Sequence, residues 1–243
     1  NTGKDCNTIM KVSKDRWQAA QEWERRVWVS ENSSLLRRLA RSVFAKLGAR
    51  NFVGDDWNHW WQENFDGYRV VPTELENVIE LGCGPYTNIR LIKSGRKIQH
   101  LICSDPLVKH YIRFKGRWLS EAWQRSEILI DDHPAEECPF ATCYFDLTVM
   151  INVLDHVRDA MQCLDQAMRI TKPGGLLVVG QDLTNSGDLS NPAIRDDVGH
   201  PIRLTHEILD EKLLPDFEPV LYRILLRAEG RNPVAHYGTY LFI

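Results

Sequence analysis

Apolar residues recur at two different spacings along the chain, and the change falls near residue 74. In the first part they repeat every three or four positions, which places them on one face of a helix. The stripe consists of Trp17, Ala20, Trp23, Val27, Trp28, Leu35, Leu36, Leu39, Val43 and Leu47. Gly48 offers an end to this helical region, and Asp55 or Asp56 offers a cap for a further short helix. Residues 1–73 are therefore expected to form a helical cap, or lid.

From residue 74 onward, short apolar runs alternate with amphipathic stretches. The runs predict strands at 77–82, 100–104, 127–131, 145–151 and 175–180. The stretches between them predict helices at 86–94, 107–119 and 159–171. A stop-and-turn signal, Lys172-Pro173-Gly174-Gly175, separates the last of these helices from the next strand. Strands that alternate with helices indicate a parallel sheet with helical crossovers.

The C-terminal part adds a different connection. It predicts a helix at about 205–214, a strand at 218–228, a turn at Arg231-Asn232-Pro233 and a strand at 234–242. Two strands joined by a short turn favour an antiparallel hairpin at the edge of the sheet. The expected fold is α/β: a doubly wound, mostly parallel seven-stranded sheet with an antiparallel C-terminal edge hairpin. Residues 74–243 are expected to form this domain as one compact unit.

Charge and apolar run length exclude two classes of partner. The chain has 243 residues, with 30 basic and 33 acidic side chains and a formal net charge of −3. Without a domain-wide basic field, no nucleic-acid partner is expected. Apolar runs such as 147–154 are far below the roughly 18 to 20 residues that span a bilayer, so no membrane partner is expected. The first thirty residues lack a signal-peptide core, and a cytoplasmic soluble protein is expected.

The cysteine pattern points to ordinary buried thiols. Six cysteines occur, none of them paired as C-x-x-C, and no histidine cluster completes a zinc-type spacing. Several lie in apolar, strand-like contexts, as Cys103 does after Leu101-Ile102. We therefore expect a reducing compartment, no disulfide framework and no metal site. The oligomeric state is left open by the sequence.

The most informative motif is Glu80-Leu81-Gly82-Cys83-Gly84, directly after the apolar pair Val78-Ile79. Its glycines allow a sharp turn and a close approach of the backbone to a ligand. Asp105 ends the next apolar run and offers a carboxylate to ribose hydroxyls. A dinucleotide-binding domain would carry a third glycine, where this chain has Thr87. The motif thus favours a nucleotide-like ligand without a pyrophosphate.

Four stretches in this order resemble the class I S-adenosylmethionine (SAM) dependent methyltransferases, in particular their small-molecule branch. They are the glycine-rich segment 78–84, the segment Leu101-Ile102-Cys103-Ser104-Asp105, the segment from Phe145-Asp146-Leu147 to Asn152-Val153-Leu154-Asp155-His156, and Thr171-Lys172-Pro173-Gly174-Gly175. The resemblance covers roughly residues 74–243. It implies SAM as the cofactor and S-adenosylhomocysteine as the product.

Residue by residue, the resemblance implies a cofactor site around the glycine-rich turn. Gly82, Cys83 and Gly84 would pass beneath the methionine and ribose parts of SAM. Glu80 would organise this loop or meet the amino group.

The second and fourth strands contribute further expected cofactor contacts. Asp105, followed by Pro106, would bind the ribose hydroxyls, a role it could combine with that of a helix cap. Asn152 would lie beside the cofactor, through its backbone.

The adenine contact departs from the family pattern. The family often carries Asp-Ala after the third strand; here Ala135 is present, but Pro134 stands at the usual Asp position. Asp131, Asp132 or His133 are the substitutes.

The acceptor side is marked less clearly. His200, between the fifth strand and the last helix, is the leading candidate for deprotonating a substrate hydroxyl, with His206 and His236 as competitors. His156, next to Asp155, is the second catalytic candidate; a surface pair is the alternative reading.

Two further features have both a functional and a structural interpretation. Trp57, Trp60 and Trp61 form either an aromatic wall for an apolar or sugar-like substrate or ordinary core packing. Arg203 would bind an anionic substrate or form a surface salt bridge.

The expected function is methyl transfer from SAM to a small-molecule acceptor, at a hydroxyl oxygen. The sulfonium is already a good leaving group, so the protein mainly aligns the reactants, excludes water and removes a proton. A nicotinamide-dependent oxidoreductase is one alternative, disfavoured by the missing third glycine and the C-terminal hairpin. A non-catalytic SAM-binding regulatory protein is the other.

Overall fold

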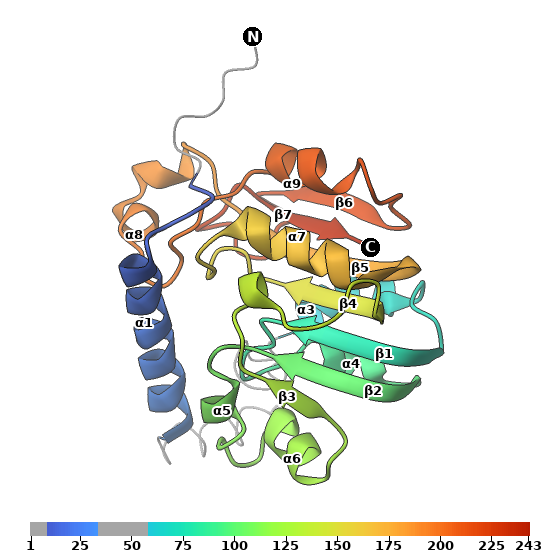
Figure 1. Ribbon diagram of the computed structural model, residues 1–243. Coiled ribbons are helices and arrows are strands. Elements are labelled where there is room, and N and C mark those ends of the chain that lie inside the picture. Colours follow the sequence, from blue (N-terminus) through green and yellow to red (C-terminus); the bar gives the residue numbers. More distant parts are fainter. Residues whose placement is uncertain (1–8, 34–57) are drawn as a thin grey trace, which may run out of the picture.

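A single twisted sheet organises the part of the chain that the computed structural model describes, residues 9–33 and 58–243 (Figure 1). Its strand order is β3-β2-β1-β4-β5-β7-β6. The strands are β1 Glu74–Leu81, β2 Lys97–Ser104, β3 Leu129–Asp131, β4 Phe145–Ile151, β5 Thr171–Leu183, β6 Tyr222–Leu226 and β7 Gly238–Phe242.

Short helices connect and cover the strands. The α-helices are α1 Lys14–Ser33, α3 His59–Asn64, α4 Ile89–Lys93, α5 Val108–Tyr111, α6 Trp118–Gln124, α7 Ala160–Ile170, α8 Pro192–Arg195 and α9 His206–Leu213. Within residues 9–33 and 58–243 they are accompanied by the 3-10 turns η1 Asp66–Tyr68, η2 Ala135–Glu137 and η3 Asp188–Ser190. In Figure 1, α7 crosses in front of the sheet, and α3 and α4 lie behind it.

The sheet confirms the expected fold class. Strands β1 to β5 pair in parallel, whereas β7 runs antiparallel to both β5 and β6. The carboxyl ends of the parallel strands face α1, which stands beside that edge of the sheet (Figure 1). Ligands of open α/β sheets bind at this edge, so α1 stands where a ligand would bind.

The structure differs locally from the sequence expectation in three places. The helix expected at 107–119 is divided into α5 and α6 because Gly116 takes a left-handed conformation with φ +70°. The segment 172–175 is a bulge within β5. Thr171 pairs with Phe145 and Leu176 pairs with Leu147, so the whole segment lies opposite the single residue Asp146 of β4. The hairpin strands are shorter than expected.

The short helix expected near residues 55–61 begins at His59, with Asn58 at its N-cap position. Asp55 and Asp56, the predicted caps, lie outside the described residues, as does the helix end predicted at Gly48.

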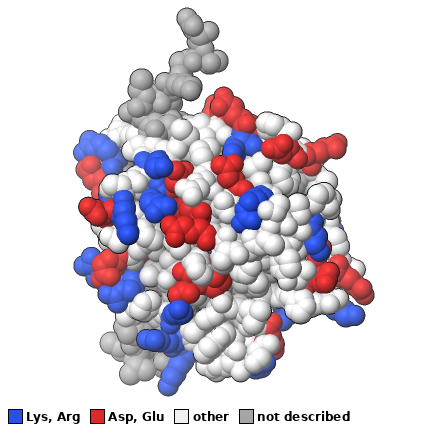
Figure 2. Space-filling model, viewed as in Figure 1, with Lys and Arg blue, Asp and Glu red and all other residues white. Residues whose placement is uncertain are grey.

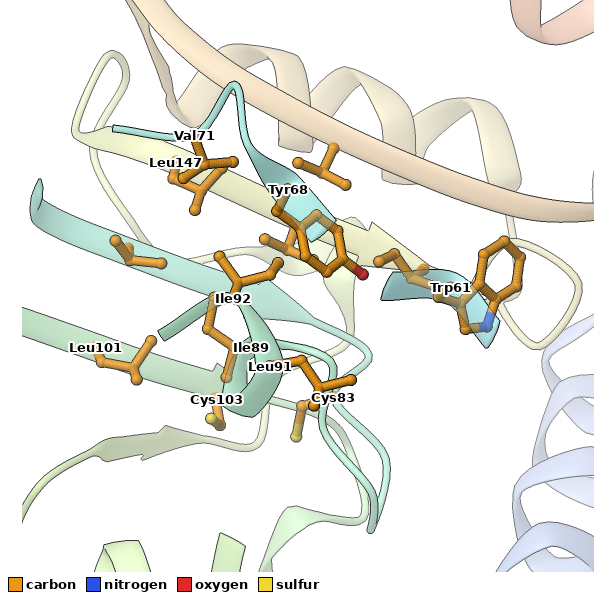
Figure 3. Packing of buried hydrophobic residues seen from close by; sticks show 14 of the residues in the cluster. Trp61, Tyr68, Val71, Cys83, Ile89, Leu91, Ile92, Leu101, Cys103 and Leu147 are labelled. Atoms are coloured by element: carbon orange, nitrogen blue, oxygen red, sulfur yellow. The ribbon is translucent and has the colours of Figure 1, made fainter. Parts of the chain in front are cut away.

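Alternation along the central strands divides the core into two layers. On β4, Leu147, Val149 and Ile151 face one layer, while Met150 faces the other. The first layer includes Trp61, Phe65 and Tyr68 from α3 and η1, and Ile89 and Ile92 from α4. Figure 3 shows Tyr68 close to Val71 and Leu147, and the α4 side chains close to Leu101 and Cys103. The second layer is formed against α7 and α9.

The surroundings of Gly82 and Gly84, the two glycines of the turn after β1, differ in the space that they leave for a side chain. Gly82 has φ +63°, and a Cβ on it would stand 2.5 Å from two side-chain carbons of Val153. Gly84 has φ +56°, but a Cβ on it would meet nothing within 4 Å among the described residues. Gly82 is therefore required by packing against the segment after β4, whereas Gly84 opens onto free space.

Alanine substitutions should separate these two cases. Gly84→Ala should cost about 1–2 kcal/mol of unfolding free energy, because only the left-handed backbone is strained. Gly82→Ala should cost about 1–3 kcal/mol more, because the new methyl group overpacks Val153. Urea denaturation followed by tryptophan fluorescence measures both values. Val153→Ala in the Gly82→Ala background is the control and should recover part of the loss; equal costs at the two glycines would contradict this account.

Candidate functional site

A cavity of about 750 Å³ opens at the carboxyl edge of the parallel strands. Its walls come from the turn after β1, the ends of β2, β4 and β5, the segment 194–203, the loop before β7, and α1 and α3. Cavities of several hundred cubic ångströms are typical of small-molecule and cofactor sites. Elements far apart in the sequence thus meet around one space large enough for a cofactor and a small acceptor.

Glu80 lies behind the glycine-rich turn and does not line the cavity. It is 1% exposed, and its carboxylate accepts hydrogen bonds from the backbone N–H groups of Asn88 (2.8 Å) and Ile89 (3.2 Å) and from the Asn88 side-chain amide (3.3 Å). Burial raises the pKa of Glu80 to about 8, although these hydrogen bonds oppose the shift. Of the two roles expected for Glu80, the geometry matches that of organising the loop.

Gly82, Cys83 and Gly84 all line the cavity, as expected. The N–H of Gly84 donates to Asp105 Oδ2 at 3.1 Å, which ties the turn to the end of β2. Asp105 Oδ1 accepts from the N–H of Leu107 at 2.7 Å, the capping contact considered above. Asp105 thus caps the segment that leads to α5 and also faces the cavity.

The ionisation of Asp105 is opposed by its surroundings. Burial, followed by the negative charge of Glu24, raises the pKa of Asp105 to about 7, although two backbone hydrogen bonds favour the charged form. Pro106, the next residue, lines a second and much smaller hollow of about 40 Å³ under α1.

This smaller hollow includes some of the residues expected near adenine. His133 and Ala135 line it together with Trp17, Gln21 and Glu24 of α1. Asp132 lies elsewhere: it is ion-paired with Lys109 at the surface and lines neither space. The structure therefore brings His133 and Ala135, but not Asp132, to a hollow that Asp105 also lines.

Asp131 organises the loop that carries His133. One of its carboxylate oxygens accepts from the Ser104 hydroxyl (2.8 Å), and the other lies 2.8 Å from His133 Nδ1.

Asn152 lines the cavity just beyond β4 in a left-handed conformation, φ +56°. Its N–H donates to the carbonyl of Gly180 at 2.6 Å, and its side-chain oxygen accepts from Arg231 at 3.3 Å. Arg231 also pairs with the buried carboxylate of Asp182. The backbone of Asn152 is therefore held at the strand end, in agreement with its expected position.

Asp155, His156 and His200 converge on the opening after β4. Each offers one polar atom, and these three atoms lie within 4.8 Å of one another. The His156 and His200 rings have centroids 4.4 Å apart. Asp155 is 7% exposed, and its Oδ1 has no hydrogen-bond partner. The two predicted catalytic histidines thus lie side by side in the same cavity.

His200 is held by a carboxylate that sequence reasoning did not single out. Its Nδ1 lies 2.7 Å from Asp197 Oδ2, which leaves Nε2 as the other ring nitrogen. Burial by itself would lower the pKa of His200, but the hydrogen bond to Asp197 and the charges of Asp155 and Asp197 outweigh it and raise the pKa. Burial opposes the charge of Asp197 too, yet its hydrogen bond to His200 holds its pKa at about 2. The pair has the geometry of a general base oriented by a carboxylate.

The segment that carries this pair is held from two sides. Arg16 of α1 donates to the carbonyls of Asp197 (2.8 Å) and Val198 (2.7 Å). Arg203 donates to the carbonyls of Ile194 (2.7 Å) and Ile202 (2.9 Å) and to that of His200. Arg203, 6% exposed, is therefore neither a surface residue nor part of a surface salt bridge, because its guanidinium holds the backbone of the segment.

Of the two competing histidines, His236 lines the cavity and His206 does not, and the two tryptophans of the cluster that the structure describes line it. His236 lines the cavity with its Nδ1 3.1 Å from the Thr184 hydroxyl, whereas His206 contacts Tyr237 outside it. Trp60 and Trp61 line the cavity, and the 1% exposed Trp61 also belongs to the core. Trp61 thus packs in the core, while the proposed role of the cluster as a substrate wall stays a prediction; Trp57 lies outside the described residues.

Two further polar side chains were missed by sequence reasoning. Glu24 of α1 lines both hollows, and Asn88 lines the larger one with an unpartnered side-chain oxygen. Glu24 follows Trp23 of the apolar stripe, and only the placement of α1 reveals its role.

The polar groups that face the cavity fit SAM. Asp105 and Glu24 present carboxylates, and Asn88 Oδ1 and Asp155 Oδ1 are buried acceptors without a partner. SAM offers the complement: a ribose diol, an ammonium group and a positively charged sulfur. The free space beside Gly84 allows a ligand to approach the backbone of the turn.

Residues 79–179, from within β1 to within β5, match the family model described as "Methyltransferase domain". No curated protein matches the sequence.

Solved structures share the fold over most of the chain. The [4+2]-cyclase SpnF has a TM-score of 0.59 at 14% identity, covering 90% of this chain and 78% of its own. The Burkholderia thailandensis 1,6-didemethyltoxoflavin-N1-methyltransferase, bound to 1,6-didemethyltoxoflavin and S-adenosylhomocysteine, has a TM-score of 0.54 at 15% identity, covering 98% and 95%. The N-methyltransferase NodS from Bradyrhizobium japonicum WM9, in complex with S-adenosylhomocysteine, has a TM-score of 0.51 at 16% identity, covering 94% and 98%.

At these identities the likeness to solved structures concerns the fold alone. The family match adds the segment that contains the glycine-rich turn, the end of β2 and the end of β4. Residues 79–179 therefore match a methyltransferase domain, and the chain has the fold of the class I SAM-dependent methyltransferases.

Proposed function

We propose that the chain transfers the methyl group of SAM to a small-molecule acceptor at a hydroxyl oxygen. The observation that carries this proposal is the His200–Asp197 pair, 2.7 Å apart, in the same cavity as the glycine-rich turn. A hydroxyl must lose its proton as it is methylated, whereas the lone pair of a neutral amine is already available. An oriented histidine base is therefore more useful to an oxygen acceptor than to a nitrogen acceptor.

The cavity divides naturally between cofactor and acceptor. The glycine turn, Asp105 and Asn152 form the cofactor side, with Glu80 holding the turn from behind. The segment 194–203 and the residues around His236 form the acceptor side. Trp60 and Trp61 add apolar surface to the same space. Such mixed lining suits a compact organic acceptor rather than a polymer.

When bound, SAM supplies an electrophilic methyl group on a positively charged sulfur. His200 Nε2 would accept the proton of the acceptor hydroxyl, which makes the oxygen available as the nucleophile. Asp197 holds the Nδ1–H of the ring and, with Asp155, stabilises the imidazolium that results. His156, packed against His200, helps to place the ring. The chain's remaining contribution is alignment of the two reactants and exclusion of water.

Comparison with the solved structures supports a small acceptor but leaves its atom open. Two of those structures are named as N-methyltransferases, and one as a [4+2]-cyclase. Methylation at nitrogen and SAM binding without methyl transfer are therefore the alternatives that turnover assays must separate. Assays of S-adenosylhomocysteine release with panels of hydroxyl and amine acceptors make the distinction, and turnover confined to amines would overturn the oxygen assignment.

We also propose a cytoplasmic protein without a nucleic-acid partner. On the face in Figure 2, basic and acidic side chains are interspersed, which gives no extended basic field for phosphates. The five cysteines in the described residues are free thiols, which suits a reducing compartment. None of the described helices is long and apolar enough to cross a membrane.

The assignment of His200 as the general base predicts a pH dependence of activity. With a hydroxyl acceptor from the panel, kcat/KM should fall as the pH drops below the raised pKa of His200, since only the neutral ring accepts a proton. Asp197→Asn removes the negative charge that raises this pKa, so the acid limb should move to lower pH. His200→Gln should lower kcat/KM by roughly 10²- to 10⁴-fold, as loss of a general base typically does.

His206→Gln is the matched histidine control and should leave the pH profile unchanged, because His206 lies outside the cavity. A profile that stays in place in Asp197→Asn would contradict the assignment of the pair.

A second prediction of this assignment concerns metal removal. Because His200 is assigned as a base, dialysis against EDTA should leave the rate of S-adenosylhomocysteine release unchanged. The measurement is needed because Asp155, His156 and His200 are also of metal-binding type. Activity that is lost with EDTA and restored by Mg²⁺ or Zn²⁺ would assign the three side chains to a metal instead.

A further inference from the structure

Glu24 brings a second carboxylate to the end of β2. It lies on α1, and its side chain lines both the large cavity and the small hollow, as Asp105 does. The negative charge of Glu24 is among the causes that raise the pKa of Asp105, so the two groups lie within electrostatic reach of each other. The two acids belong to elements about 80 positions apart in the sequence.

The contacts of Glu24 leave part of its carboxylate available. Oε1 accepts from the Trp28 indole N–H (3.2 Å) and the Tyr111 hydroxyl (3.3 Å). Oε2 lies 3.6 Å from His156 Nδ1, beyond ordinary hydrogen-bond distance. Asp105, for its part, has one backbone donor on each oxygen, and a carboxylate oxygen can accept more than one hydrogen bond.

Two carboxylates in one buried place favour a ligand that donates hydrogen bonds to them or carries positive charge. Within the described residues, no Lys or Arg is ion-paired with either carboxylate. Asn88 Oδ1 and Asp155 Oδ1, in residues that are 5% and 7% exposed, line the same cavity without a hydrogen-bond partner, and Asp155 Oδ1 lies 3.9 Å from His156 Nε2. All four groups are acceptors, so the missing partner donates hydrogen bonds or carries positive charge.

We propose that Glu24 is a second ribose-binding residue, so that the cofactor's diol lies between Asp105 and Glu24 and donates one hydroxyl to each. The inference rests on the proposed function, because it requires the adenosine half of SAM near the end of β2. The large cavity, which Glu24 and Asp105 both line, has room for that half, and the small hollow beside Pro106, His133 and Ala135 adjoins the same two acids. It follows that α1 is part of the cofactor site and is stabilised in place when the cofactor binds.

Binding measurements on the intact chain test this directly. Isothermal titration calorimetry with SAM, S-adenosylhomocysteine and 5′-methylthioadenosine uses three ligands that share the ribose diol but differ in charge and in the amino-acid end. Glu24→Gln should weaken all three by about tenfold, the size of effect expected for one hydrogen bond to a charged group. Glu22→Gln, on the same helix and paired with Arg25 at the surface, is the matched control and should leave affinity unchanged.

A pH series distinguishes ligand binding from a structural role. The groups around Asp105 that affect its charge are Glu24 from α1, Glu80 and Cys83 from β1 and its turn, and Tyr111 from α5. Hydroxyl donors prefer the ionised carboxylate, so 5′-methylthioadenosine should bind more tightly as the pH rises through the titration of Asp105. Glu24→Gln removes a negative charge that raises the pKa of Asp105, so this rise should move to lower pH.

Glu24→Asp separates the charge from the reach of the side chain, and it serves if Glu24→Gln folds poorly. It keeps the negative charge, so the pH dependence should stay in place, while the shorter side chain should still weaken binding of all three ligands.

The outcomes distinguish this inference from the proposed function. If the wild-type chain binds none of the three ligands, the cofactor assignment fails. If the wild type binds and Glu24→Gln binds as well, the diol assignment to Glu24 is overturned. A loss confined to SAM would also overturn it, because the acid would then serve the positive sulfur. An unmoved pH profile in Glu24→Gln would leave Glu24 a purely structural role and would equally overturn the inference.

Discussion

The buried carboxylate of Glu80 joins the parts from which the cofactor side is built. It accepts hydrogen bonds from the backbone N–H groups of Asn88 and Ile89, at the start of α4, and from the Asn88 amide. A buried carboxylate without such donors would be costly, and burial raises the pKa of Glu80 to about 8 even with them. Because its donors come from beyond the glycine turn, Glu80 closes that turn and directs Gly84 toward the cavity.

The segment proposed to form the acceptor side depends on an analogous arrangement with the charges reversed. Arg16 and Arg203 donate to backbone carbonyls of the segment that carries Asp197 and His200. An irregular segment beside a cavity leaves carbonyl groups without secondary-structure partners, and guanidinium groups can satisfy several at once. One of the two arginines comes from α1, so the helix that closes the cofactor side also supports the proposed base. The packing of α1 against the sheet edge therefore contributes to both halves of the cavity.

The fold was predictable because its signals are local. Apolar runs of strand length alternate with amphipathic stretches, and within strands such as β4 alternate residues face the two core layers. The differences arose where one residue changes the backbone direction, as Gly116 does between α5 and α6. The bulge in β5 is of the same kind, because the register of Leu176 is decided by its pairing with Leu147 and not by its own sequence neighbours.

The sequence by itself determined the fold class, the glycine turn and the acid after the second strand. These are read from spacing within short segments, where covalent geometry and chain direction restrict the possibilities. Only the tertiary structure decided that Gly82 is required by Val153, that Glu80 lies behind the turn, and that Asp132 points to the surface. Only the tertiary structure also brings Glu24 close to Asp105, and His156 close to His200. Such pairs join residues distant in sequence, and their proximity follows from how α1 and the long loops pack against the sheet edge, which no local pattern records.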